Sequence, residues 1–160
     1  MVILGIDPGF ATIGYGVVSY DRGKFHTINY GAITTAPGRP LYVRLQEIYR
    51  DMLELIDLFR PDEMSVEELF FNTNITTGIQ VAHARGIILL AAAQKNLKIA
   101  EYTPLQVKQA VVGYGRAEKK QVMEMTKMIL GLDKIPRPDD AADALALAIC
   151  HGHAGNSRLR

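Results

Sequence analysis

Short apolar runs separated by turn residues fill the first quarter of the chain and predict strands. These runs cover residues 2–6, 14–20 and 25–35, and the second and third are rich in β-branched and aromatic side chains. Asp7-Pro8-Gly9 and Asp21-Arg22-Gly23 lie between them, and both sequences favour tight turns. The pattern predicts a three-stranded meander.

From residue 41 the apolar positions take on helical spacing. Apolar side chains recur every three or four residues across 41–59, and Pro61 ends the pattern, which predicts an amphipathic helix. A strand is predicted at 63–69, followed by a helix at 76–95 whose second half has no polar face. We expect that second helix to lie in the core or against another subunit.

The last third of the chain is predicted to contain one strand and three helices. The strand covers 98–102, and Thr103-Pro104 begins a short helix because Thr can cap it and Pro fits its first position. Two further helices are predicted at 117–130 and 139–150. Residues 152–160 are small and polar, so we expect them to be a flexible, frayed tail.

The predicted order of elements indicates a mixed α/β fold in one domain. Three strands precede a helix, a strand, a helix, a strand and three helices, which suits a five-stranded mixed sheet flanked by helices. Folds of the ribonuclease H type begin in the same way, although periodicity alone does not select that fold from other α/β arrangements. We expect residues 1–151 to form this single domain.

Composition restricts the class of protein further. The chain has 160 residues, of which 48% are hydrophobic and 22% charged, as in ordinary soluble domains. No apolar stretch approaches the roughly 18 residues that cross a bilayer, and the N-terminus lacks the features of a signal peptide. The single cysteine, Cys150, excludes an internal disulfide and resembles a small buried hydrophobe. We therefore expect a cytoplasmic protein with no membrane contact.

Charge is distributed unevenly along the chain although the net charge is only +1. Residues 47–68 contain eight acidic and two basic side chains, whereas residues 108–137 contain seven basic and three acidic ones. The basic segment predicts a surface for a polyanion, unless both segments are ordinary solvated helix faces.

Asp7 is the first candidate for chemistry. It ends the first predicted strand among uncharged neighbours, and Pro8 and Gly9 then turn the chain. A partly buried carboxylate needs a basic residue, a backbone turn or a metal to compensate its charge. Alternatively, Asp7 only stabilises the turn.

Glu67 and Glu68 form a second acidic site at the end of the fourth predicted strand. Successive strand side chains face opposite sides, so Glu67 shares a face with Ser65, and Glu68 shares the other with Val66. If both faces are covered, alternation leaves the choice open. One or both glutamates alternatively mark the solvated end of the strand.

A third acidic site opens the last predicted helix. Asp140 and Asp143 are three residues apart and share a helix face, and Asp139 and Asp143 could also share one. Alternatively, one of the first two aspartates only caps the helix. The alanines around them would let this helix approach a sheet closely.

Three acidic sites on separate elements favour a shared metal site. Clustered carboxylates raise one another's pKa, and a divalent cation relieves that repulsion. All-oxygen ligands suit magnesium, with manganese as a substitute. Two such ions would support the hydrolysis of a phosphodiester bond, as in many nucleases.

With these residues identified, the chain resembles the RuvC family of bacterial Holliday junction resolvases. The matching motifs run in order through nearly the whole chain: Gly5-Ile6-Asp7-Pro8-Gly9, Gly14-Tyr15-Gly16, Val66-Glu67, Phe70, Asn72, Ala84-Arg85-Gly86, Gln106-Val107-Lys108-Gln109, Val112-Gly113, Ala117-Glu118-Lys119 and Asp140-Ala141-Ala142-Asp143-Ala144-Leu145-Ala146. Their distribution makes the resemblance more specific than any one motif.

This resemblance implies a ribonuclease H-like endonuclease of recombination and DNA repair that nicks two symmetric strands of a four-way junction. It also implies a homodimer that uses the apolar helix at 76–95, and a partner in the RuvA–RuvB branch-migration complex. By resemblance, Asp7, Glu67, Asp140 and Asp143 are the catalytic metal ligands, and Asp139 is a cap.

The resemblance also points to three DNA-binding residues. Phe70 matches an aromatic near the junction centre, where it could stack on a base, whereas Phe71 is an ordinary core candidate. Lys108 and Lys119 match basic residues near the scissile phosphate, although exposed helix lysines are common.

Two other functions compete with this interpretation. The first glycine-rich motifs also resemble the phosphate loop of actin-type ATPases and sugar kinases, but those proteins enclose a nucleotide between two such domains. A non-catalytic DNA-binding module is the second, and the presence of all four carboxylates argues against it.

Overall fold

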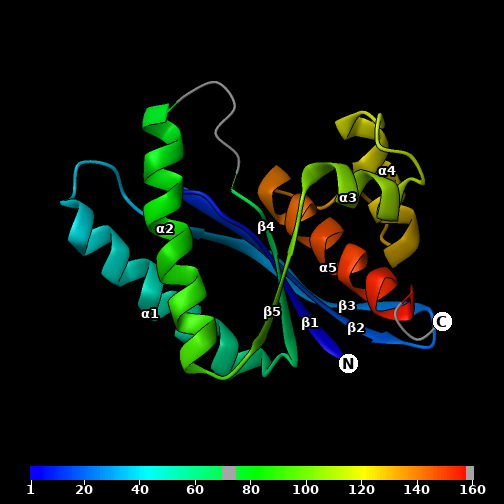
Figure 1. Cartoon of the computed structure of the whole chain (residues 1–160), viewed down its shortest axis with the longest axis horizontal. Coiled ribbons are helices and arrows are strands. Elements are labelled where there is room, and N and C mark those ends of the chain that lie inside the picture. Colours follow the sequence, from blue (N-terminus) through cyan, green and yellow to red (C-terminus); the bar gives the residue numbers. More distant parts are fainter. Residues whose placement is uncertain (70–74, 158–160) are drawn as a thin grey trace.

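The computed structural model, which describes residues 1–69 and 75–157, contains the predicted mixed sheet (Figure 1). Its strands are β1 (Val2–Asp7), β2 (Thr12–Asp21), β3 (Lys24–Thr34), β4 (Glu63–Glu67) and β5 (Lys98–Tyr102). They lie in the order β3-β2-β1-β4-β5. The meander of β1 to β3 is antiparallel, and β4 and β5 continue the sheet parallel to β1. The five-stranded mixed sheet expected from the sequence is confirmed.

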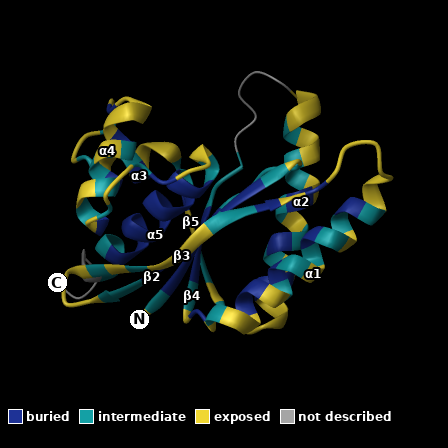
Figure 2. Ribbon diagram, turned by 180° about the vertical axis from the view of Figure 1, so that it is seen from behind, coloured by how far each residue is buried: buried dark blue, intermediate teal, exposed yellow. Residues whose placement is uncertain are grey.

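Helices cover both faces of this sheet (Figure 1). They are α1 (Leu41–Phe59), α2 (Ile75–Gln94), α3 (Pro104–Val111), α4 (Lys119–Leu130) and α5 (Asp139–Ser157). One hydrophobic core joins α1 and α2 to the sheet, and a second joins α5, α3 and α4 to its other face. Figure 2 shows α5 as a largely buried helix, whereas the outer faces of α1 and α2 are exposed.

Glycines in the sheet allow α5 to lie directly on it. A Cβ atom at Gly5 would be 2.0 Å from the backbone oxygen of Ala144, and one at Gly14 would be 1.9 Å from that of Asp140. Neither position can hold a side chain at this separation, and Ala144 itself is fully buried. The predicted role of small helix residues in close sheet contact is therefore confirmed. This contact brings the start of α5 to the end of β1.

The last helix is longer than the sequence predicted. α5 continues to Ser157, beyond the predicted helix end at residue 150, and the expected flexibility of the tail stays a prediction. Gly152 is buried against the Phe25 ring, and His153 lies edge-on to the same ring at 5.3 Å between centroids. These contacts with the β2–β3 hairpin stabilise a segment whose own residues are poor helix formers.

The apolar helix α2 is only partly in the core. Ala84, Ile88 and Ala92 are fully buried, but Ile79 and Leu90 are 48% and 47% exposed. By length and composition alone α2 could cross a membrane. This is weak evidence for a membrane span, because core helices pass the same test and α2 packs into the core. We expected α2 to lie in the core or against another subunit. The core covers only one face of the helix.

Candidate active site

The pleat of the sheet directs Asp7 and Glu67 toward α5. On β1, Asp7 lies on the same face as Gly5, two residues earlier, and the Gly5 Cα faces α5. On β4, Glu67 lies on the same face as Ser65, whose hydroxyl donates to the Leu147 carbonyl of α5 at 2.7 Å. Both carboxylates therefore lie at neighbouring strand ends on the α5 side. Glu68 follows the end of β4 and is not among the described residues that line the cavity next to Asp7.

The start of α5 supplies two more carboxylates. One oxygen each from Asp7, Asp140 and Asp143 lies within 4.8 Å of the others. Asp139 has a different contact, a 3.1 Å ion pair with Arg137, and is exposed. The structure thus separates the adjacent aspartates that spacing alone left equivalent. Asp140 faces Asp7, whereas Asp139 faces solvent.

This crowding of carboxylates changes their protonation. Burial, followed by the charges of Asp143 and Glu67, raises the pKa of Asp7 from 3.8 to about 9. Burial also raises the pKa of Glu67 and of Asp143 above their ordinary values. The low local dielectric and the like charges act in the same direction, so without added positive charge the cluster retains protons.

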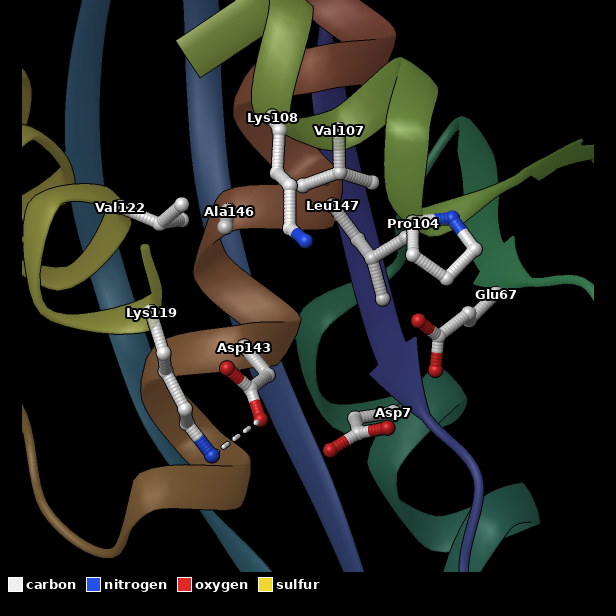
Figure 3. Close-up of a pocket in the computed structure, with 10 residues that line it drawn as sticks. All are labelled: Asp7, Glu67, Pro104, Val107, Lys108, Lys119, Val122, Asp143, Ala146 and Leu147. Atoms are coloured by element: carbon white, nitrogen blue, oxygen red, sulfur yellow. Dashed lines mark ion pairs between the residues drawn. The ribbon is translucent and has the colours of Figure 1, made fainter. Parts of the chain in front are cut away.

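Lys119, at the start of α4, partly offsets the negative charge. Its Nζ lies 3.5 Å from Oδ2 of Asp143, and this proximity lowers the pKa of that aspartate against the effect of burial (Figure 3). The lysine side chain is 59% exposed, so solvent weakens its effect. One exposed lysine does not neutralise the cluster.

The carboxylates open onto a cavity of about 260 Å³ between α3, α4 and α5. Lys108 and Lys119 both line it, and Lys108 points into it from α3 (Figure 3). The structure thus brings both predicted lysines to the cavity that Asp7, Glu67 and Asp143 also line. The predicted aromatic, Phe70, lies outside the described residues.

The apolar wall of this cavity, built by α3, α4 and α5, was not predicted from the sequence. It is formed by Pro104, Val107, Val122, Ala146 and Leu147. In the sequence such residues only indicate helix faces that pack into a core, and no spacing distinguishes core from cavity. The wall reduces the access of water to one side of the carboxylates.

The donor set fits divalent metal ions. Carboxylate oxygens from two elements converge, and burial together with the neighbouring negative charges raises the pKa of Asp7. Hard cations such as Mg²⁺ prefer oxygen ligands of this kind. Among the described residues of this cluster, only carboxylates are available as ligands, which argues against a zinc or redox-metal site.

A ribonuclease H-like sheet with carboxylates at the ends of β1 and β4 and at the start of α5 defines a nuclease of the ribonuclease H-like class. The comparisons with known proteins specify the family. The family described as "Crossover junction endodeoxyribonuclease RuvC" matches residues 3–151. The chain belongs to this family of endodeoxyribonucleases.

Individual relatives agree over nearly the full length. The crossover junction endodeoxyribonuclease RuvC of Alkaliphilus metalliredigens is 59% identical over 98% of this chain and 95% of its own. The structure of Thermus thermophilus RuvC matches with a TM-score of 0.92 at 38% identity, covering 99% of this chain and 97% of that one. T. thermophilus RuvC in complex with Holliday junction substrate matches with a TM-score of 0.90 at 35% identity, covering 98% and 96%.

Proposed function

We propose that this protein resolves four-way (Holliday) DNA junctions in recombination and repair by nicking two symmetric strands. The observation that carries the proposal is the carboxylate cluster at the end of β1, in a chain that is 35% identical to a relative solved with Holliday junction substrate. The proposed catalytic residues and metal ligands are Asp7, Glu67, Asp140 and Asp143.

The proposed cofactor is Mg²⁺, most simply as two ions, with Mn²⁺ as a substitute. When bound, such ions activate water and stabilise charge on the phosphate. The part of this chain is to hold them: Asp7 is fixed by β1, and Asp140 and Asp143 by the first two turns of α5. The raised pKa of Asp7 supports this role, because a cation would favour the ionised carboxylate.

The lysines of the cavity are proposed to act on the scissile phosphate. Lys119 contacts Asp143 and remains largely exposed, so its ammonium can reach a phosphate oxygen beside the carboxylates. Lys108 lines the opposite side of the same cavity. Charge from both sides would bind the phosphate and stabilise negative charge that develops in the transition state. The resemblance adds Phe70, which would stack on an unpaired base.

The exposed apolar face of α2 supports a homodimer. Ile75, Ile79 and Leu90 are 71%, 48% and 47% exposed on one helix, and a second copy would cover them. Two active sites in a dimer would match two symmetric nicks. We also propose a cytoplasmic location, as expected from the composition of the chain, and, from the family resemblance, an interaction with the RuvA–RuvB branch-migration complex.

The test compares a synthetic four-way junction with a linear duplex of the same sequence. In Mg²⁺ the purified protein is expected to nick the junction on two strands of like polarity and to leave the duplex intact. In EDTA it should cleave neither substrate. Equal cleavage of both substrates would indicate a general nuclease and overturn the proposal. Phe70→Ala is expected to retain its melting temperature but to cleave the junction more slowly. Unchanged cleavage would remove the proposed role of Phe70.

A further inference from the structure

Arg85 links α2 to the end of β4. Its Nε donates to the main-chain oxygen of Glu67 at 3.2 Å, and its Nη2 lies 3.1 Å from Oε1 of Glu101 on β5. The Arg85 side chain is only 14% exposed, whereas that of Glu101 is 44% exposed. The guanidinium therefore holds one carbonyl and one carboxylate with different edges of the same rigid fork.

The position of this contact matters because Glu67 is the last residue of β4. The parallel pairing with β5 ends at Glu67 and Tyr102, and the Glu68 N–H still donates to the Tyr102 carbonyl at 2.9 Å. The Arg85 side chain donates to the Glu67 carbonyl from the α2 side. The backbone that carries the Glu67 carboxylate is thus held from β5 on one side and from α2 on the other.

We propose that Arg85 is a positioning residue for Glu67. By fixing the Glu67 carbonyl, it sets the direction in which the Glu67 side chain leaves the strand and enters the cavity beside Asp7. Glu101 in turn orients the guanidinium. The inference rests on the proposed role of Glu67 as a metal ligand, and it makes the packing of α2 a determinant of metal affinity.

Loss of this contact should weaken the metal site more than it weakens the fold. Residues that orient metal ligands typically change metal affinity or activity by about 10- to 100-fold when replaced. Arg85→Gln removes both the charge and the fork. Arg85→Lys keeps the charge but cannot make both contacts, so its effect should be intermediate. Glu101→Gln leaves Arg85 in place and should have the smallest effect.

The test measures Mn²⁺ binding to the DNA-free protein by calorimetry, together with junction affinity in EDTA, the Mg²⁺ dependence of cleavage and the melting temperature. For Arg85→Gln we expect the Kd for Mn²⁺ to rise about 10- to 100-fold and junction affinity to change less than about twofold. Lys95→Gln is the matched control, because it removes a 2.8 Å surface ion pair with Asp57 next to α2. Its Mn²⁺ affinity should equal that of the wild type.

Two results would overturn the role of Arg85. One is wild-type Mn²⁺ affinity in folded Arg85→Gln, and the other is equal loss of Mn²⁺ affinity in the Lys95→Gln control. Should Arg85→Gln not fold, Arg85→Lys must show weaker Mn²⁺ binding at an unchanged melting temperature, and wild-type binding would refute the proposal. Glu67→Gln separates the two hypotheses. If it binds Mn²⁺ normally, the proposed function of Glu67 fails, whereas an impaired Glu67→Gln with normal Arg85→Gln rejects only the positioning role.

Discussion

Replacing Asp7 with Asn is expected to reduce the pH dependence of stability in the metal-free protein. In the folded state, burial and neighbouring carboxylates raise the pKa of Asp7 to about 9, whereas an unfolded chain releases this proton near 3.8. Between these values the folded state binds more protons than the unfolded state. The contribution of Asp7 to the free energy of unfolding is therefore fully present below about pH 4 and is lost as the pH rises toward 9.

The size of this pH dependence follows from the one proton that the Asp7 carboxyl retains in the folded state. Each pH unit in this interval lowers the free energy of unfolding by up to about 1.4 kcal/mol. Between about pH 5.5 and about pH 7.5 the wild type should therefore lose about 2 to 3 kcal/mol more than Asp7→Asn. Glu67 and Asp143, whose pKa values are also raised, act in the same direction, so some slope remains in the variant.

Urea unfolding in EDTA at both pH values measures this difference. Asp133→Asn is the matched control, because Asp133 is an exposed carboxylate outside the cluster, and its slope should equal that of the wild type. Equal pH slopes for Asp7→Asn and the wild type would refute the reasoning. That result would mean that Asp7 is already ionised in the metal-free fold and has no deficit of positive charge around it.

Three further changes test other parts of the structure. Gly14→Ala introduces a Cβ 1.9 Å from the Asp140 backbone oxygen, so it should lower the free energy of unfolding by about 1 to 3 kcal/mol in urea unfolding, and unchanged stability would contradict the contact. Lys119→Met should raise the pKa of Asp143, shift the pH–rate profile to higher pH and slow junction cleavage by about 100-fold. A wild-type pH–rate profile would exclude the role of Lys119. Leu90→Glu should convert the proposed dimer into a monomer by light scattering, and an unchanged mass would remove α2 from the interface.

The periodicity of apolar residues was sufficient to predict the strands and helices. Alternating and helical patterns are local, so each element could be found from its own residues. Asp7 and the pair on α5 were predictable for a similar reason, because each lies at an element end next to small residues. Local signals of this kind report which positions are special but not which of two adjacent residues faces a site.

The choice between Glu67 and Glu68 needed information from elsewhere in the chain. Alternation grouped Glu67 with Ser65, and the bond from the Ser65 hydroxyl to the Leu147 carbonyl identifies that face as the one under α5. Arg85 gave no local signal of its contact for the same reason, since Glu67 and Glu101 lie on separate strands. Long-range packing decides these assignments.

Gly14 and the C-terminal helix show a second limit of prediction from local sequence. In the sequence, Gly14 belongs to a motif that also resembles a phosphate loop, whereas in the fold it makes room for the backbone of α5. The end of α5 was expected to fray because its residues are small and polar. Contacts of Gly152 and His153 with Phe25 outweigh that local preference. At the end of α5, tertiary contact overrides helix propensity.

Cleavage of a four-way junction by Asp7→Asn tests the central proposal, a metal-ion nuclease site, most directly. The measurement is single-turnover nicking in Mg²⁺ by wild type and variant, with junction affinity determined in parallel in EDTA. We predict that Asp7→Asn binds the junction as the wild type does and nicks it at least about 1,000-fold more slowly. Nicking at the wild-type rate by Asp7→Asn would contradict the proposed site.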